Sequence, residues 1–307
     1  NRNMKKVLSI SLGSSSRDKV VVQKFKNETI RIERRGTDGD KAKTQALFAA
    51  YDGKVDALGL GGTDLYIYAG GKRYEFLESA QLISQVRSTP VVDGSGLKNS
   101  LERQLVAKLE KRGIIKFSDK KVLLVCGVDR FGLAEALAEA GAQITFGDLI
   151  YGLGWNKPLK SLTTLAQFAG VLAPIITKLP VSWFYPMGES QTQRTERYPE
   201  YFAANDIIAG DFHFIRKFMP DHLPGKIIIT NTVTTKDRAL LQQAGVACLV
   251  TTTPNFDGRS FGTNVLEACL VALNGKQQAL TAQDYERLLE EYNVQPGIDY
   301  LGTKELG

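Results

Sequence analysis

The chain has 307 residues and a formal net charge of +6. Hydrophobic residues make up 43% of it and charged residues 23%, as in ordinary globular proteins. This composition excludes a disordered chain, a collagen-like repeat and a disulfide scaffold, and the length favours two domains. Because Lys and Arg are scattered rather than gathered in a stripe, we expect a small anionic metabolite and no nucleic acid as the partner.

The first third of the sequence predicts an α/β domain over residues 1–115. Its predicted strands are Val7–Leu12, Val20–Phe25, Ile30–Arg34, Val55–Leu60 and Pro90–Val92. Gly70–Gly71 indicates a hairpin between Leu65–Tyr68 and Arg73–Phe76. The predicted helices are Lys41–Tyr51, Ser79–Val86 and Leu97–Arg112.

Strands and helices alternate cleanly after residue 120, which predicts a Rossmann-like, doubly wound parallel sheet over residues 120–275. We expect its strands at Lys121–Cys126, Gln143–Phe146, Asp206–Ala209, Lys226–Thr230 and Ala247–Thr251. The expected helices are Leu133–Ala140, Thr235–Ala244, Asn264–Leu273 and Ala282–Tyr292, and residues 149–200 read as irregular and partly helical. We expect residues 276–307 to form a C-terminal helix and tail, and one of the two late helices is free to pack across the domain boundary.

The sequence favours a cytoplasmic protein. Cys126, Cys248 and Cys269 lie in apolar runs without metal-ligand spacing, which is typical of buried, reduced thiols, so we expect no metal site. No signal peptide is expected at the first residues. The apolar run Phe168–Ile176 has about half the length that spans a bilayer, contains Pro174 and is closed by Lys178, so we expect a buried helix or a lid over an apolar pocket. Surface association with a membrane through Phe168–Tyr185 is the last-ranked alternative. The expected assembly is a homodimer.

The most informative segment is Val122–Asp148, which reads VLLVCGVDRFGLAEALAEAGAQITFGD. Gly127 and Gly132 hold the first and third positions of the G-x-G-x-x-G fingerprint, and Asp148 follows where an acid would accept ribose hydrogen bonds. Gly127 permits a tight turn, and Gly132 lets the helix approach the strand. The helix N-terminus then offers N–H groups to a pyrophosphate.

Asp129 stands where the fingerprint has its middle glycine. A carboxylate there adds bulk and negative charge beside a dianion, and Arg130 is the residue that could offset it. The alternative is that Asp129 is simply the N-cap of the helix. The segment therefore predicts the fold clearly and leaves a dinucleotide site and another use of the turn both open.

Four phrases carry a resemblance to a known group: GLGGTDLY (Gly59–Tyr66), VDGSGLKNSLER (Val92–Arg103), AGDFHFIRKFMP (Ala209–Pro220) and TTTPNFDGRSFGTN (Thr251–Asn264). The chain resembles the two-domain NAD(P)-dependent dehydrogenases, and in particular a bacterial group labelled quinate 5-dehydrogenase. The resemblance implies a substrate domain followed by a Rossmann domain. It also implies a catalytic Lys–Asp pair, for which Lys98 and Asp93 are the candidates.

Residues 93–99 (DGSGLKN) also indicate an anion or substrate site from their chemistry alone. The run follows a strand and precedes the best helix, with Ser95 able to cap or bind and Lys98 in the first turn. A glycine-rich turn with a solvated lysine is the alternative.

Further candidates follow later strands. His213 follows the strand Asp206–Ala209, where it could move a proton during carbonyl–alcohol interconversion; a packed or capping histidine is the alternative. Asp211, two residues before it, is a substrate-binding candidate that could also orient His213. The resemblance places Asn231 and Thr252 beside a nicotinamide ring.

Two candidates lie in the run RSFGTN. Arg259 could hold a carboxylate in two hydrogen bonds, or be a surface residue. Asn264 is a substrate candidate, and with Glu267 it has the spacing of a capping box.

These observations lead to two hypotheses. The first is an oxidoreductase that uses NAD, with NADP disfavoured because Asp148 would repel a 2′-phosphate, and that acts on a small hydroxylated carboxylic acid of the quinate or shikimate kind. The second is a ligand-binding, sensing or transferase protein that keeps the sheet and does not use a dinucleotide, which Asp129 favours.

Overall fold

The structure is a computed structural model that describes residues 4–184, 194–256, 259–275 and 279–302. It divides into two compact units, and each is built from separate stretches of the chain. The first unit comprises Asn1–Lys98, Val171–Gln191 and Phe261–Val294, and the second comprises Asn99–Gly170, Thr192–Ser260 and Gln295–Gly307.

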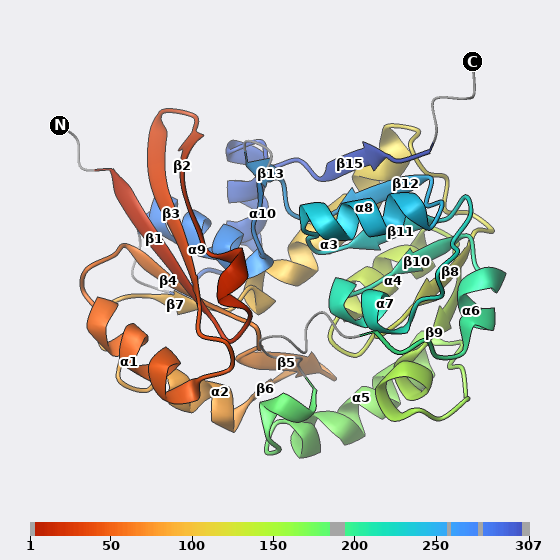
Figure 1. Cartoon of the computed structure of the whole chain (residues 1–307), viewed down its shortest axis with the longest axis horizontal. Helices are drawn as coiled ribbons and strands as arrows, with labels where there is room; N and C mark the ends of the chain where they lie inside the picture. Colours follow the sequence, from red (N-terminus) through yellow and green to blue (C-terminus); the bar gives the residue numbers. More distant parts are fainter. Residues whose placement is uncertain (1–3, 185–193, 257–258, 276–278, 303–307) are drawn as a thin grey trace. The chain divides into compact units, whose positions relative to one another are not determined.

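The sheet of the first unit has the strand order β2-β3-β1-β4-β7 (Figure 1). Its strands are β1 (Lys5–Ser11), β2 (Lys19–Phe25), β3 (Glu28–Gly36), β4 (Ala57–Gly61) and β7 (Val91–Val92). Strand β2 runs antiparallel to β3, and the other pairs are parallel. A separate hairpin joins β5 (Tyr66–Ala69) to β6 (Lys72–Glu75), as predicted.

Helices of the first unit begin where the sequence offers caps and apolar faces. Asp40 caps α1 (Lys41–Tyr51) by accepting a hydrogen bond from the Lys43 N–H at 2.9 Å. Helix α9 (Thr263–Asn274) packs against β1 and β4 and is buried from Val265 to Ala272, which is why this late segment returns to the first sheet. The other helical segments are η1 (Ser15–Arg17), α2 (Leu77–Leu82), η3 (Val181–Trp183) and α10 (Ala282–Glu291).

The second unit has the predicted doubly wound sheet, in the strand order β15-β12-β11-β10-β8-β9 (Figure 1). The parallel strands are β8 (Lys121–Leu124), β9 (Gln143–Phe146), β10 (Ile207–Ala209), β11 (Ile227–Thr230) and β12 (Cys248–Thr251). An edge strand that the sequence did not predict, β15 (Gly297–Tyr300), runs antiparallel to β12. The strand order reverses between β8 and β10, and this switch point is where α/β sheets usually bind ligands.

Helical segments of the second unit are α4 (Phe131–Glu139), η2 (Asp148–Gly152), α6 (Pro199–Ala204), α7 (Phe212–Phe218) and α8 (Thr235–Gln243). The short strands β13 (Asn255–Phe256) and β14 (Arg259–Ser260) pair with each other. One core cluster contains Val125, Tyr151, Phe202 and Phe218.

Two helices contribute residues to both units: α3 (Ser95–Lys111) and α5 (Leu162–Ile176). Helix α5 lies in the stretch that the sequence predicted to be irregular and partly helical. Among the described residues, no helix has the combination of length and apolar character that crossing a bilayer requires. Tyr185, the last residue of the run considered for membrane association, lies outside the described residues.

Candidate functional site

The turn after β8 is closed by the side chain of Asp148, which is only 4% exposed. Its carboxylate accepts hydrogen bonds from the Gly127 N–H at 2.9 and 3.0 Å and from the Val128 N–H at 2.9 Å. Burial raises the pKa of Asp148 to about 6, against the lowering effect of these two amides. The Arg130 N–H donates to the Gly127 carbonyl at 3.1 Å. The amides of Gly127, Val128 and Arg130 are therefore already paired within the turn.

Asp129 lies close to the thiol of Cys126 and to Asp148. The Cys126 Sγ–H donates to Asp148 Oδ2 at 3.4 Å, and burial together with Asp148 and Asp129 raises the pKa of this thiol well above its usual range. The N-cap residue of α4 is Arg130, so the alternative in which Asp129 caps the helix is wrong. Asp129 instead adds its negative charge to the inner side of the turn.

Arg130 is almost fully buried and connects three elements. Its guanidinium forms an ion pair with Glu102 of α3 and a second one, at 3.6 Å, with Asp211 after β10. The exposed fractions are 4% for Arg130, 1% for Glu102 and 24% for Asp211. These two carboxylates balance the charge of Arg130. From the sequence, Arg130 was the residue that could offset the charge of Asp129. Sequence reasoning missed Glu102. The sequence signal for it is an acidic residue among the regularly spaced apolar residues of the predicted helix.

Asp211 is the N-cap of α7 and accepts a hydrogen bond from the backbone N–H of His213 at 2.8 Å. The carboxylate thus holds the main chain of His213 at the start of α7. Asp211 also accepts from the Asn231 side-chain amide at 3.2 Å, and Asn231 Oδ1 accepts from the Phe212 N–H at 3.1 Å. Asp211, His213 and Asn231 are half-buried.

Thr252 and Thr253 follow β12 and face the same backbone carbonyl. Both hydroxyls donate to the Asn231 carbonyl oxygen, at 3.4 and 3.2 Å, and the two residues are 3% and 1% exposed. The structure therefore brings Asp129, Arg130, Asp148, Asp211, Asn231 and Thr252 together at the carboxyl ends of neighbouring strands.

Gly132 has a different role from the predicted one. A Cβ atom at this position would lie 2.7 Å from Asn99 Oδ1 and 3.1 Å from Asn99 Cα, so the glycine lets α4 approach α3 and not a strand. At Gly127, a Cβ atom would meet the side chains of Leu165 and Phe146 at 2.9 and 3.0 Å. The close approach of the Asn99 main chain thus favours glycine at position 132, whereas the contacts at Gly127 are with the ends of side chains.

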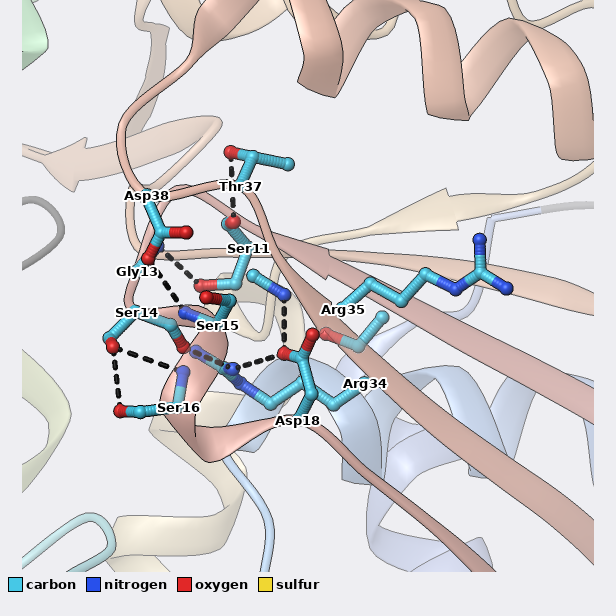
Figure 2. A network of polar contacts seen from close by, with 12 residues as sticks. Ser11, Gly13, Ser14, Ser15, Ser16, Asp18, Arg34, Arg35, Thr37 and Asp38 are labelled. Atoms are coloured by element: carbon cyan, nitrogen blue, oxygen red, sulfur yellow. Dashed lines mark hydrogen bonds and ion pairs between the residues drawn. The ribbon is translucent and has the colours of Figure 1, made fainter.

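A serine-rich loop that contains Ser14, Ser15 and Ser16 follows β1 at the carboxyl edge of the first unit's sheet (Figure 2). Asp38 Oδ1 accepts from the Ser15 N–H at 2.8 Å, which lowers the pKa of Asp38. Asp18 Oδ1 accepts from the Gly36 N–H at 2.6 Å and from Arg34 at 3.1 Å. Burial, followed by the charge of Arg17, lowers the pKa of Arg34 to about 10. The loop is thus tied to the end of β3 by its own charged groups.

At the end of β7, Asp93 is 8% exposed and holds two backbone segments. It accepts from the Leu65 N–H at 2.6 Å and from the Ser95 N–H and hydroxyl at 3.1 and 2.7 Å. Lys98 forms an ion pair with Asp64 at 3.9 Å. The structure thus places Asp93, Ser95 and Lys98 on one turn, with Asp64 as a charge partner that the sequence had not assigned to Lys98.

The predicted capping box at Asn264 and Glu267 is wrong, because α9 begins after Gly262 and has no side-chain cap. Asn264 Oδ1 instead accepts from the Ser9 hydroxyl at 2.6 Å. The Glu267 carboxyl group instead contacts the turn that contains Asp93. It accepts hydrogen bonds from the Gly94 N–H at 2.7 Å and from the Tyr285 hydroxyl. The signal for it is an ionisable residue inside an otherwise apolar helix. Arg259 belongs to β14, and its side chain lies outside the described part of the chain.

Comparison with protein families places this chain. A model described as a domain of unknown function, DUF8754, matches residues 96–301. The chain belongs to the DUF8754 family. A second model, DUF8753, also described as a domain of unknown function, matches residues 6–93. No protein of curated function matches. The resemblance to the quinate 5-dehydrogenase group stays a prediction.

Solved structures similar to this DUF8754 protein have low sequence identity to it. Glutamate dehydrogenase 2 from Plasmodium falciparum is 13% identical, with 94% of this chain and 70% of that chain covered and a TM-score of 0.42. L-tryptophan dehydrogenase from Nostoc punctiforme is 11% identical, with 95% of this chain and 80% of that chain covered and a TM-score of 0.39. A periplasmic ribose ABC transporter from Conexibacter woesei is 9% identical, with 94% of this chain and 95% of that chain covered and a TM-score of 0.37. The activities named are those of the matched proteins.

The turn after β8 does not fit a dinucleotide pyrophosphate in the way the fingerprint predicts. A pyrophosphate binds to backbone N–H groups that have no other partner, whereas those of Gly127, Val128 and Arg130 are paired within the turn. The surrounding acids, Asp129, Asp148, Asp211 and Glu102, outnumber Arg130. An added dianion would therefore meet net repulsion in a partly buried setting.

Proposed function

We propose that this protein binds a small polar ligand at the carboxyl edge of the second unit's sheet without using a nicotinamide dinucleotide. It would act as a ligand-binding, sensing or transferase protein. The observation that carries the proposal is the Asp148 carboxylate, which holds the Gly127 and Val128 amides. Because a carboxylate from the end of β9 already closes this turn, the turn has no need of a phosphate to order it.

The position of the site follows from the topology of the sheet. The ends of β8 and β10 lie on either side of the switch point, and the ion pair between Arg130 and Asp211 joins them. Asp211 and Asn231 are half-buried, so they present polar atoms while being fixed by other contacts.

The charge at this edge favours a ligand that donates hydrogen bonds or carries positive charge. Asp129 and Asp211 supply carboxylates, and Asn231 supplies an amide. Ammonium and hydroxyl groups are the natural partners of such acceptors. We therefore propose small amines, amino acids through their amino group, or polyols as the ligand class at this edge. The predicted small anionic metabolite would not suit it.

A second candidate function is an NAD-dependent dehydrogenase acting on a small hydroxylated acid such as a quinate- or shikimate-like compound. The strand order of the second sheet and the spacing of Gly127, Gly132 and Asp148 favour it. NADP would be less suitable because the Asp148 carboxylate would repel a 2′-phosphate.

Calorimetric titration with NAD separates the two functions. We expect the wild-type protein to give no binding at millimolar NAD, and Asp129→Gly to bind NAD at most weakly, because Asp148 still holds the Gly127 and Val128 amides. Asp119→Gly is the matched control, because Asp119 is an exposed residue at a φ of 62° that glycine adopts freely. Saturable NAD binding by the wild-type protein and by Asp119→Gly would replace the proposed function with the dehydrogenase.

A ligand screen tests the proposed class directly. Thermal unfolding is followed with millimolar primary amines, amino acids and polyols, and we expect at least one to raise the melting temperature of the wild-type protein. Asp211→Asn should lose that rise, whereas Asp221→Asn, at a side chain that is 82% exposed, should keep it. An identical rise in Asp211→Asn would place the ligand elsewhere.

A further inference from the structure

Glu267 is a buried acid whose partners are unusual for a charged group. It is 2% exposed, and it accepts hydrogen bonds from the Gly94 N–H and the Tyr285 hydroxyl. It takes part in no ion pair among the described residues. A carboxylate removed from water without a cation nearby is costly, so such a group usually keeps its proton.

The ionisable groups around Glu267 make its charged form still less favourable. Asp93 approaches from the turn after β7, Tyr285 from α10, and Tyr66 and Tyr68 from β5. None of these groups is a cation. Burial, and then the negative charge of Asp93, raise the pKa of Glu267 to about 8.

The backbone around Glu267 has the shape that its carboxyl group requires. A Cβ atom at Gly96 would lie 2.6 Å from Glu267 Oε2, so the glycine leaves room for the carboxyl group in its present position. Gly94 has a φ of 94°, and its carbonyl accepts from the N–H groups of Leu97 and Lys98 at 3.2 and 2.9 Å. One residue thus donates to Glu267 and starts helix α3.

We propose that Glu267 is a positioning residue that, as a neutral acid, fixes the turn from Asp93 to Ser95 and the first turn of α3, and so sets the place of Asp93 and Lys98. This inference concerns the first unit and does not depend on the ligand site proposed for the second. It gives the candidate residues Asp93 and Lys98 a shared support that no motif in the sequence indicates.

The pH dependence of urea unfolding tests the protonation of Glu267 in the full chain. Glu267→Gln is the isosteric neutral variant, and Glu286→Gln, at an exposed position of α10, is the control. Glu267→Gln should match the wild type at pH 5 and have the higher urea midpoint at pH 9, whereas Glu286→Gln should follow the wild type throughout. A Glu267→Gln curve that runs parallel to the wild type from pH 5 to pH 9 would overturn the proposal.

Two further measurements separate positioning from bulk stability. Asp93→Asn should move the pH midpoint of the Glu267 effect downward, because the facing negative charge is gone, and an unchanged midpoint would contradict the proposed pairing. Hydrogen exchange at the Gly94 amide should stay slow in Glu267→Gln and quicken at least tenfold in Glu267→Ala, relative to the amide of Val125 in the second unit. Equal protection at Gly94 in all three proteins would show that Glu267 does not hold the turn.

Discussion

Arg130 and Glu102 form an ion pair in which the side chains are only 4% and 1% exposed. The pair joins α3 to the turn that follows β8, and the second contact of Arg130, with Asp211, extends it to the end of β10. A buried guanidinium between two carboxylates has more than a packing role, because each partner depends on the others for compensation of its charge.

Removing Arg130 alone should therefore be severe. Arg130→Met leaves Glu102 buried without its cation, and we expect a loss of about 3–5 kcal/mol in the free energy of unfolding. The double variant Glu102→Met/Arg130→Met should recover much of that loss, because no uncompensated charge is then buried. Urea denaturation of the three proteins measures both effects.

The control for this prediction is the pair between Arg103 and Glu135, whose side chains are 43% and 37% exposed. Arg103→Met should cost no more than about 1 kcal/mol, as is usual for surface pairs. Equal losses in Arg103→Met and Arg130→Met would mean that the buried pair is no more important than a solvated one.

Asp148 should make stability depend on pH in the acid range. Its pKa is about 6 in the folded chain and 3.8 for the ordinary group, so the folded state binds more protons between these values. Stability therefore falls as the pH rises from 3.8 to about 6 and is level above that, by an amount on the order of 3 kcal/mol.

Comparison of Asp148→Asn with the wild type isolates this contribution. The variant should gain on the wild type as the pH rises through that interval, and the difference should be complete by about pH 7. Asp119→Asn, at an exposed turn, should show no such gain. A stability difference that grows as the pH falls would mean that Asp148 is stabilised as a carboxylate and would reverse the assignment.

Local patterns predicted most of the regular structure. Helix Lys41–Tyr51 and strand Gln143–Phe146 have the predicted bounds, because a capping aspartate and a glycine-ended helix mark them in the sequence. The edge strand β15 was not predicted, since its short sequence is only half-buried and pairs with a distant strand. One of the two late helices was expected to be free to pack across the domain boundary, and α9 does pack against β1 and β4, but no local pattern indicated which of the two helices would do so.

The candidate sites were predictable only in part, for a physical reason. Residues that follow strands gather at the sheet edges, so Asp211, Asn231 and Thr252 were found together. Glu102 and Glu267 act from the middle of helices on turns far away in sequence. The partner of such a side chain depends on tertiary packing, and neither spacing nor composition indicates it.

Gly132 and Gly170 are helical glycines in opposite surroundings, and alanine should affect them in opposite directions. At Gly132, a Cβ atom would press on Asn99 Oδ1 at 2.7 Å and on the Asn99 backbone, whereas at Gly170 it would meet nothing within 4 Å. We expect Gly132→Ala to cost about 1–3 kcal/mol through overpacking, and Gly170→Ala to gain up to about 1 kcal/mol from helix propensity. Thermal or urea unfolding gives both values.

Asn99→Ala in the Gly132→Ala background should relieve the side-chain part of the clash and leave the part that comes from the Asn99 Cα. Because that residual clash is with the main chain of α3, full recovery in the double variant would show that the two helices can move apart, and a neutral Gly132→Ala would remove the close approach as the reason for glycine at this position.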